Sequence, residues 1–141
     1  MRLLPTFDQH FCDGLALVDI AEHLDLELLT GDERHHRLAE KLRMAVIDVE
    51  RLKQGWRPSH ENLVDAPVLI GWDFGGSLGA GSTVLVGFVA GHPQLGSDSL
   101  CTTSVLVAID TRQWSWARTL SRFYRLEKPS QALSPPGSRD F

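Results

Sequence analysis

The chain has 141 residues, of which 43% are hydrophobic, and a formal net charge of −4 at pH 7. This length supports one hydrophobic core, and no stretch approaches the roughly 18 apolar residues that span a bilayer, so we expect a soluble, cytoplasmic protein with no membrane partner. The two cysteines, Cys12 and Cys101, lack the spacing of a metal site or a disulfide scaffold, so we expect free thiols.

The charged residues are unevenly distributed along the chain. Residues 1–66 hold 13 Asp and Glu against 8 Lys and Arg, whereas residues 111–128 hold four arginines and Lys128 against Glu127 alone. The acidic total argues against binding of duplex nucleic acid driven by counterion release. A local basic patch still allows contact with an acidic partner surface.

Residues 1–74 are predicted to form a helical region followed by a connector. Asp32 can cap a helix that Gly55 ends, because apolar residues recur between them at spacings of four, three, four and three. An upstream stripe fits a second helix, with Thr30-Gly31 as the turn of an antiparallel hairpin, although alternation over residues 24–28 also fits a strand. The run Val68 to Trp72 is interpreted as an apolar connector. The apolar positions are Leu38, Leu42, Ala45, Val49 and Leu52 downstream, and Leu17, Ile20, Ala21, Leu24 and Leu28 upstream.

Residues 75–82 are rich in glycine and are predicted to form a loop that leads into a β module, residues 83–129. Thr83 to Ala90 and Leu100 to Ile109 have the composition of two buried strands. The segment Trp114 to Leu126 fits either a helix or strands, and we favour strands with a bend near Ser121. Residues 130–141 are expected to be a disordered tail. The predicted fold is therefore α+β, with an N-terminal helical hairpin packed on a small antiparallel β-sheet or partly open barrel.

Two motifs suggest a bound phosphate or a bound metal ion, but each lacks a feature that such a site requires. Gly76 to Thr83 has the spacing of a phosphate-binding loop, but Ser82 replaces the lysine that reaches the terminal phosphates, and a strand-like run follows where a helix should begin. The histidines lack the spacing that places two metal ligands on one helical face. We therefore predict no cofactor and no metal.

A third motif suggests catalysis. His92, Asp98, Cys101 and Ser104 lie close together in sequence and offer a base next to a thiol or a hydroxyl. Closeness in sequence does not supply the geometry that such a site needs. A small hydrolase that uses His92 with Cys101 or Ser104 is nevertheless one alternative function.

The segment Trp114 to Leu126 is the main candidate contact surface. Aromatic rings interleaved with arginines on one strand face are typical of single-stranded nucleic-acid-binding modules, in which the rings stack on bases and the guanidinium groups follow phosphates. In the opposing interpretation the rings belong to the core and the arginine stems pack against them. The candidate binding residues are Trp116, Arg118, Arg122, Tyr124 and Arg125, together with His92 in the nearby turn.

Several sequence elements together support a resemblance. They are Val86-Gly87-x-Val89-x-Gly91-His92-Pro93-x-Leu95-Gly96, Thr103-Ser104 and Trp116-Ala117-Arg118-Thr119-Leu120-Ser121-Arg122-Phe123-Tyr124-Arg125-Leu126, preceded by Glu50-Arg51-Leu52 and Asp65-Ala66-Pro67. From Glu50 to Pro129 the chain resembles a family of small bacterial proteins classed only as a domain of unknown function. The family pattern has glycine where Glu127 stands, so the exit from the last strand can differ.

The second half also resembles a widespread bacterial and phage β module. That module has a Gly-His-Pro turn, a Thr-Ser pair and a Thr-x-Ser-Gly-x-x-Tyr-x-Leu ending, in which Arg122 replaces the glycine here. The resemblance implies a small barrel-like sheet, with strand, turn and strand over Trp116 to Leu126. It implies a fold more than a function.

We expect a non-catalytic binding or regulatory protein whose partner is a protein complex rather than free nucleic acid. By analogy with small acidic proteins of mobile elements, the more specific hypothesis is an inhibitor of a host nucleic-acid-processing complex, similar in style to anti-CRISPR proteins. In that hypothesis the acidic helices occupy a nucleic-acid channel, and Arg118, Arg122 and Arg125 pair with acidic residues of the partner. A single-stranded nucleic-acid-binding module is the other alternative.

Overall fold

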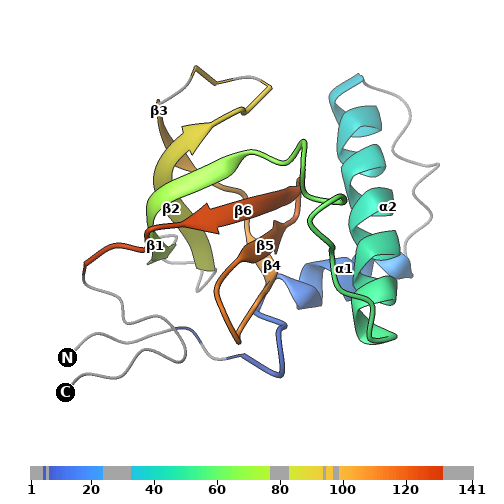
Figure 1. Cartoon of the computed structure of the whole chain (residues 1–141). Coiled ribbons are helices and arrows are strands. Elements are labelled where there is room, and N and C mark those ends of the chain that lie inside the picture. Colours follow the sequence, from blue (N-terminus) through green and yellow to red (C-terminus); the bar gives the residue numbers. More distant parts are fainter. Residues whose placement is uncertain are drawn as a thin grey trace.

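The computed structural model describes residues 5, 7–23, 33–76, 83–93, 95–96 and 99–131, with the side chains of residues 33–35 left out. In these described parts of the chain, two helices and six strands follow one another (Figure 1). The helices are α1 (Leu15–Glu22) and α2 (Glu33–Lys53), and the strands are β1 (Val68–Gly76), β2 (Thr83–Ala90), β3 (Ser99–Thr102), β4 (Leu106–Ile109), β5 (Trp116–Thr119) and β6 (Phe123–Glu127). The fold is α+β, as the sequence predicts.

The six strands form one open sheet in the order β3-β2-β1-β6-β5-β4. Four of its pairings are antiparallel, but β1 and β6 run parallel, so the expectation of a purely antiparallel sheet is wrong. Local sequence could not reveal this pairing because β1 and β6 are joined in the sheet but separated in the chain by the four other strands.

The central strand β1 was not expected from the sequence. The run Val68 to Trp72, interpreted as a connector, begins this strand, which pairs with β2 on one side and β6 on the other. Its register against β2 shifts between Ile70 and Asp73, and Gly71 there adopts a φ of 64°, a conformation that glycine accepts readily. This bulge interrupts the alternation by which strands are recognised in sequence.

The predicted strand Leu100 to Ile109 is divided into β3 and β4. Between them, the Thr103 N–H donates to the Leu85 carbonyl, and the Thr103 hydroxyl accepts from the Leu85 N–H. These bonds hold the Thr103 backbone against β2, while the chain continues to β4 at the far end of the strand order. Apolar composition alone does not show where such a division falls.

Two buried cores lie on the two faces of the sheet. Neighbouring residues of a strand point to opposite faces, and accordingly Ala117 joins a core enclosed by the strands while Trp116 joins a core beneath the helices. β2 and β4 contact each other although they are distant in the strand order, so the sheet curls around the first core. The second core includes Val49 and Leu52 of α2.

Helix α2 matches its prediction over most of its length. Leu42, Ala45, Val49 and Leu52 are buried, but Leu38 is 43% exposed and Ala39 is buried instead. Helix α1 buries Val18 and Ala21, whereas Leu17 and Ile20 of the predicted stripe are exposed. The apolar face of α1 is therefore rotated relative to the predicted stripe.

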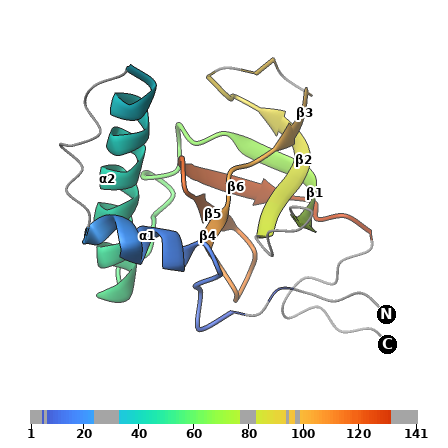
Figure 2. The same ribbon diagram turned by 180° about the vertical axis from the view of Figure 1, so that it is seen from behind.

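The two helices are in contact but cross one another (Figures 1 and 2). Leu24, Leu28, Thr30-Gly31 and Asp32 lie outside the described residues, as do residues 132–141 of the expected tail. The predicted antiparallel hairpin is therefore not confirmed. Neither of the two helices that the structure describes is long and apolar enough to cross a membrane.

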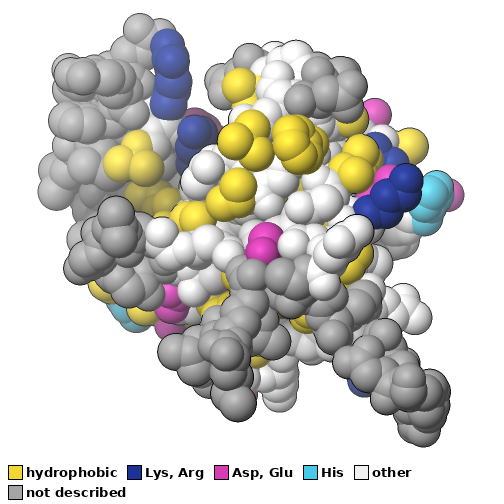
Figure 3. All heavy atoms as spheres, turned by 90° about the vertical axis from the view of Figure 1, so that its left-hand side faces the viewer, with side chains coloured by type: hydrophobic (Ala, Val, Ile, Leu, Met, Phe, Trp, Pro, Cys, Tyr) yellow, Lys and Arg dark blue, Asp and Glu magenta, His cyan; other side chains and the backbone are white. Residues whose placement is uncertain are grey.

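The two edge strands of the sheet differ in what covers them. Residues 10–14 run along β4 and form backbone hydrogen bonds to Leu106, Val107 and Ile109. Gly14 is required in this segment because an added Cβ would collide with the Leu106 carbonyl. β3 forms the opposite edge, and its Leu100 is 64% exposed beside Phe88, which is 51% exposed. Figure 3, viewed from the β3 side, shows hydrophobic side chains gathered on this face.

Candidate functional site

The first candidate site is a cleft of about 230 Å³ between α2 and the sheet, called the α2–sheet cleft below. It contains three of the residues that the sequence singled out for binding, His92, Arg122 and Tyr124, and both alternative nucleophiles, Cys101 and Ser104. The remaining lining residues are Lys41, Leu95, Thr102, Thr103 and Ser121. The sequence elements Gly-His-Pro, Thr-Ser and Ser-Arg-Phe-Tyr thus meet at one place.

The short turn between β5 and β6 positions Arg122. The Thr119 N–H donates to the Arg122 carbonyl at 2.9 Å, and the Thr119 hydroxyl accepts from the Ser121 and Arg122 N–H groups at 3.3 Å. Across the turn, the Ser104 hydroxyl donates to Oγ of Ser121 at 3.0 Å. Hydroxyl groups therefore close the turn and direct Arg122 towards the cleft, where its Nε is buried with no hydrogen-bond partner in the described part of the chain.

The α2–sheet cleft is positively charged. Lys41 and Arg122 line it, and no Asp or Glu occurs among its described lining residues. Burial lowers the pKa of His92, and the charge of Arg122 lowers it further. Two cations in a cleft without a described acid suit the binding of an anionic group.

The same cleft gives little support to a nucleophile. Burial raises the pKa of the Cys101 thiol, although a hydrogen bond with Tyr124 opposes this effect. Burial, with the neighbouring Cys101, raises the pKa of Tyr124 to about 12. Reactive cysteines have a lowered pKa, and the Ser104 hydroxyl is already donated to Ser121.

The remaining sequence-predicted residues lie elsewhere. Arg118 is 1% exposed, and its Nε lies 3.0 Å from Oδ2 of Asp48 on α2, while its Nη1 donates to the Thr119 carbonyl. Arg125 donates from Nε to the Ala66 carbonyl at 3.0 Å. Trp116 is buried. Arg118 and Arg125 are thus used to join parts of the fold, and the arginines do not form one continuous face.

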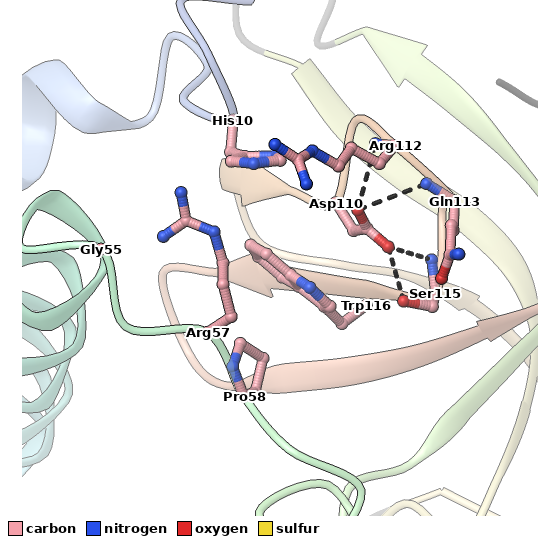
Figure 4. A pocket seen from close by; sticks show the side chains of 9 residues that line it. All are labelled: His10, Gly55, Arg57, Pro58, Asp110, Arg112, Gln113, Ser115 and Trp116. Atoms are coloured by element: carbon pink, nitrogen blue, oxygen red, sulfur yellow. Dashed lines mark hydrogen bonds between the residues drawn. The ribbon is translucent and has the colours of Figure 1, made fainter.

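A second and larger cleft, of about 500 Å³, lies at the opposite end of β5, at the loop that joins β4 to β5 (Figure 4). We call it the arginine cleft. Its walls come from three separate segments of the chain: His10, residues 55–58 after α2, and the loop 110–115 with Trp116. The lining residues are His10, Gly55, Arg57, Pro58, Asp110, Arg112, Gln113, Ser115 and Trp116.

Asp110 organises the loop 110–115. Its carboxylate accepts hydrogen bonds from the N–H groups of Arg112, Gln113 and Ser115 and from the Ser115 hydroxyl, the last at 2.6 Å. The loop also places Trp114 at a φ of 53°. Burial raises the pKa of Asp110, but the hydrogen bonds from Ser115, Arg112 and Gln113 outweigh burial and hold this pKa below its usual value. The aspartate is therefore ionised, and its carboxylate stabilises the loop.

Sequence reasoning missed the arginine cleft. Arg112 entered only the count of basic residues, His10 was considered only among the rejected metal ligands, and Arg57 was not singled out. The three come from distant segments that only the fold brings together. In the described part of the chain, no three His, Cys, Asp or Glu residues are grouped so that they could hold a metal ion.

These features define a small α+β protein with a curled, open mixed sheet and a polar cleft at each end of β5. Residues 40–136 match the model of a family described as "Family of unknown function (DUF6634)", and the chain belongs to this family. The chain matches no curated protein and no solved structure. The resemblance to an uncharacterised family is thereby confirmed.

Proposed function

We propose that the protein is a non-catalytic binding protein and that the α2–sheet cleft receives an acidic segment of a protein partner. The observation that carries this proposal is the pair of cations, Lys41 and Arg122, in a cleft that has no acid among its described lining residues. A carboxylate from a partner would form charge-assisted hydrogen bonds with these two side chains.

The neighbouring edge strand supports a partner with an extended backbone. β3 forms the uncovered edge of the described sheet, and Thr102 and Leu95 connect it to the cleft. Exposed edge strands are used to add a strand from a partner. An extended acidic segment could pair with β3 and direct its carboxylates towards Lys41 and Arg122.

A more specific form of the proposal makes the partner a host nucleic-acid-processing complex and the protein a mobile-element inhibitor, similar in style to anti-CRISPR proteins. Arg122 is compatible with the partner contacts of that hypothesis. Its acidic helices have weaker support, because α2 carries six Lys and Arg against four Asp and Glu. Burial of Trp116 and Tyr124 also counts against the alternative of base stacking on these rings.

Comparative affinity capture tests the proposal. The tagged protein, its Arg122→Gln and Leu100→Glu variants and an Arg43→Gln control would be captured from the cells that produce it, and the recovered partner would then be purified and titrated directly. Arg43 is a suitable control because it lies on the exposed part of α2, 3.8 Å from Glu40. We expect one defined complex that forms through an acidic segment of the partner, weakens about tenfold or more with either variant and persists in the control. Recovery of the same proteins with all four, or of none, would reject the proposal.

A further inference from the structure

The arginine cleft is separate from the cleft of the proposed function and has the features of an anion site. Arg57 and Arg112 enter it from different segments, and Figure 4 shows both guanidinium groups directed into the same space. Asp110 is the only acid among its described lining residues, and its oxygens are turned towards the loop, as the dashed lines in Figure 4 mark. Two cations therefore share a cleft in which the one described carboxylate already accepts hydrogen bonds from the loop.

Arg57 is held in place by the end of α2. Its Nη1 donates to the Leu52 carbonyl at 2.9 Å and to the Trp56 carbonyl at 2.8 Å. Carbonyl groups at and just beyond a helix C-terminus attract cations, so these bonds fix the position of the guanidinium group without neutralising its charge. Its other nitrogen atoms have no hydrogen-bond partner in the described part of the chain and can donate to a ligand.

The guanidinium group of Arg112 is available to a ligand. The backbone N–H of this residue donates to Asp110, whereas its guanidinium group forms no hydrogen bond or ion pair with any residue that the structure describes. It lines the cleft together with His10 (Figure 4). Asp110 bonds to the backbone of Arg112 and not to its side chain, so a substitution of this side chain leaves the hydrogen bonds of the loop intact.

His10 adds a fixed polar group between the two arginines. It is buried, and its Nδ1 lies 3.0 Å from the Ile109 carbonyl oxygen and 3.0 Å from the Thr111 backbone nitrogen. Nδ1 donates to the Ile109 carbonyl in one tautomer and accepts from the Thr111 N–H in the other, in which Nε2 carries the proton and can donate to a ligand. Nε2 is the ring nitrogen left for the cleft. A neighbouring hollow of about 320 Å³, lined by Gln9, His10, Arg57, Thr111 and Arg112, extends the same polar surface.

We propose that the arginine cleft binds the phosphate group of a small molecule, with Arg57, Arg112 and His10 around the phosphate oxygens. The planar fork of guanidinium donors matches phosphate oxygens, and such charge-assisted bonds are stronger than neutral ones. The volume suits a small ligand rather than a polymer. The chain's net charge of −4 also disfavours an extended nucleic-acid backbone.

Calorimetric titration of the whole chain tests this assignment, with adenosine monophosphate and inorganic phosphate as probes and adenosine, acetate and an oligonucleotide without terminal phosphate for comparison. Wild-type protein should bind both phosphate probes and not adenosine. Arg112→Gln should weaken binding of adenosine monophosphate about tenfold or more, while Arg43→Gln, which removes the same charge from α2, should change it less than about twofold.

The proposal fails if neither phosphate probe binds, if Arg112→Gln binds adenosine monophosphate as wild type does, or if Arg43→Gln weakens it equally. Acetate binding as tightly as phosphate would replace phosphate by carboxylate as the ligand class and would overturn it. Tighter binding of the unphosphorylated oligonucleotide would overturn it in favour of a nucleic-acid surface. An unchanged urea midpoint of Arg112→Gln shows that the variant is folded, and a changed midpoint would contradict the finding that this side chain supports no part of the loop.

Discussion

The two ends of β5 use their polar residues in different ways. At one end, the loop 110–115 is closed by a carboxylate that collects hydrogen bonds from the loop, and Arg112 is left facing a cleft. At the other end, hydroxyl groups close the turn, and Arg122 faces a cleft with an unpaired Nε. Between them Arg118 is buried against Asp48. Arginines a few residues apart therefore have different roles, set by what the fold places opposite each one.

The largest effect on stability is expected for Arg118, which lies between the two ends of β5. Asp48→Asn would leave the buried Arg118 charge without its partner, and we expect a loss of about 3 kcal/mol in the free energy of unfolding, measured by urea denaturation. Arg51→Ala is the control, because Arg51 lies 3.8 Å from the same carboxylate but is 54% exposed. It should cost about 1 kcal/mol or less. Equal losses would show that Arg118 is no more structural than a surface arginine.

A smaller loss is expected at the loop end. Asp110→Ala removes the acceptor of four hydrogen bonds and should cost about 2 kcal/mol at pH 7. The control Asp65→Asn, at an exposed position, should stay within about 0.5 kcal/mol. Similar unfolding free energies for the two variants in urea would contradict the role of Asp110.

The same aspartate should make stability depend on pH. The pKa of Asp110 is lower in the folded than in the unfolded chain, so its contribution is present above the unfolded value of about 3.9 and is lost as pH falls through the folded value. Urea denaturation of wild type and Asp110→Asn between pH 7 and pH 3 should therefore show a smaller acid loss in the variant. An unchanged acid loss would mean that the carboxylate is not stabilised by the loop.

The smallest effect is expected at the turn end and distinguishes the two clefts directly. Arg122→Gln should raise the pKa of His92, because the charge of Arg122 lowers that pKa in the folded protein. The free energy of unfolding should change by no more than about 1 kcal/mol, since Arg122 forms no salt bridge with any residue that the structure describes. Arg112→Gln should leave the His92 pKa unchanged. Titration by NMR measures the His92 pKa in both variants. Equal shifts of this pKa would mean that the charge in the arginine cleft acts on His92 as strongly as Arg122 does.

Much of the local structure could be predicted because it depends on neighbours in sequence. The apolar spacing of α2, the strand Thr83 to Ala90 and the division of Trp116 to Leu126 into two strands about Ser121 all agree with the structure. The turn that brings Arg122 to the α2–sheet cleft follows from that division. Periodicity cannot decide which side of a helix is covered, and Leu17 and Ile20 of the predicted stripe are exposed.

The sequence by itself determined the fold class, most of the helix and strand positions and the family, because these depend on local patterns of apolar residues, turns and motifs. Only the tertiary structure decided that β1 lies at the centre of the sheet, that Arg118 is buried and that Arg57, Arg112 and His10 share a cleft. Each of these results depends on contacts between segments far apart in the chain. The cost or benefit of placing a charge depends on the groups around it, and a linear sequence does not specify those groups.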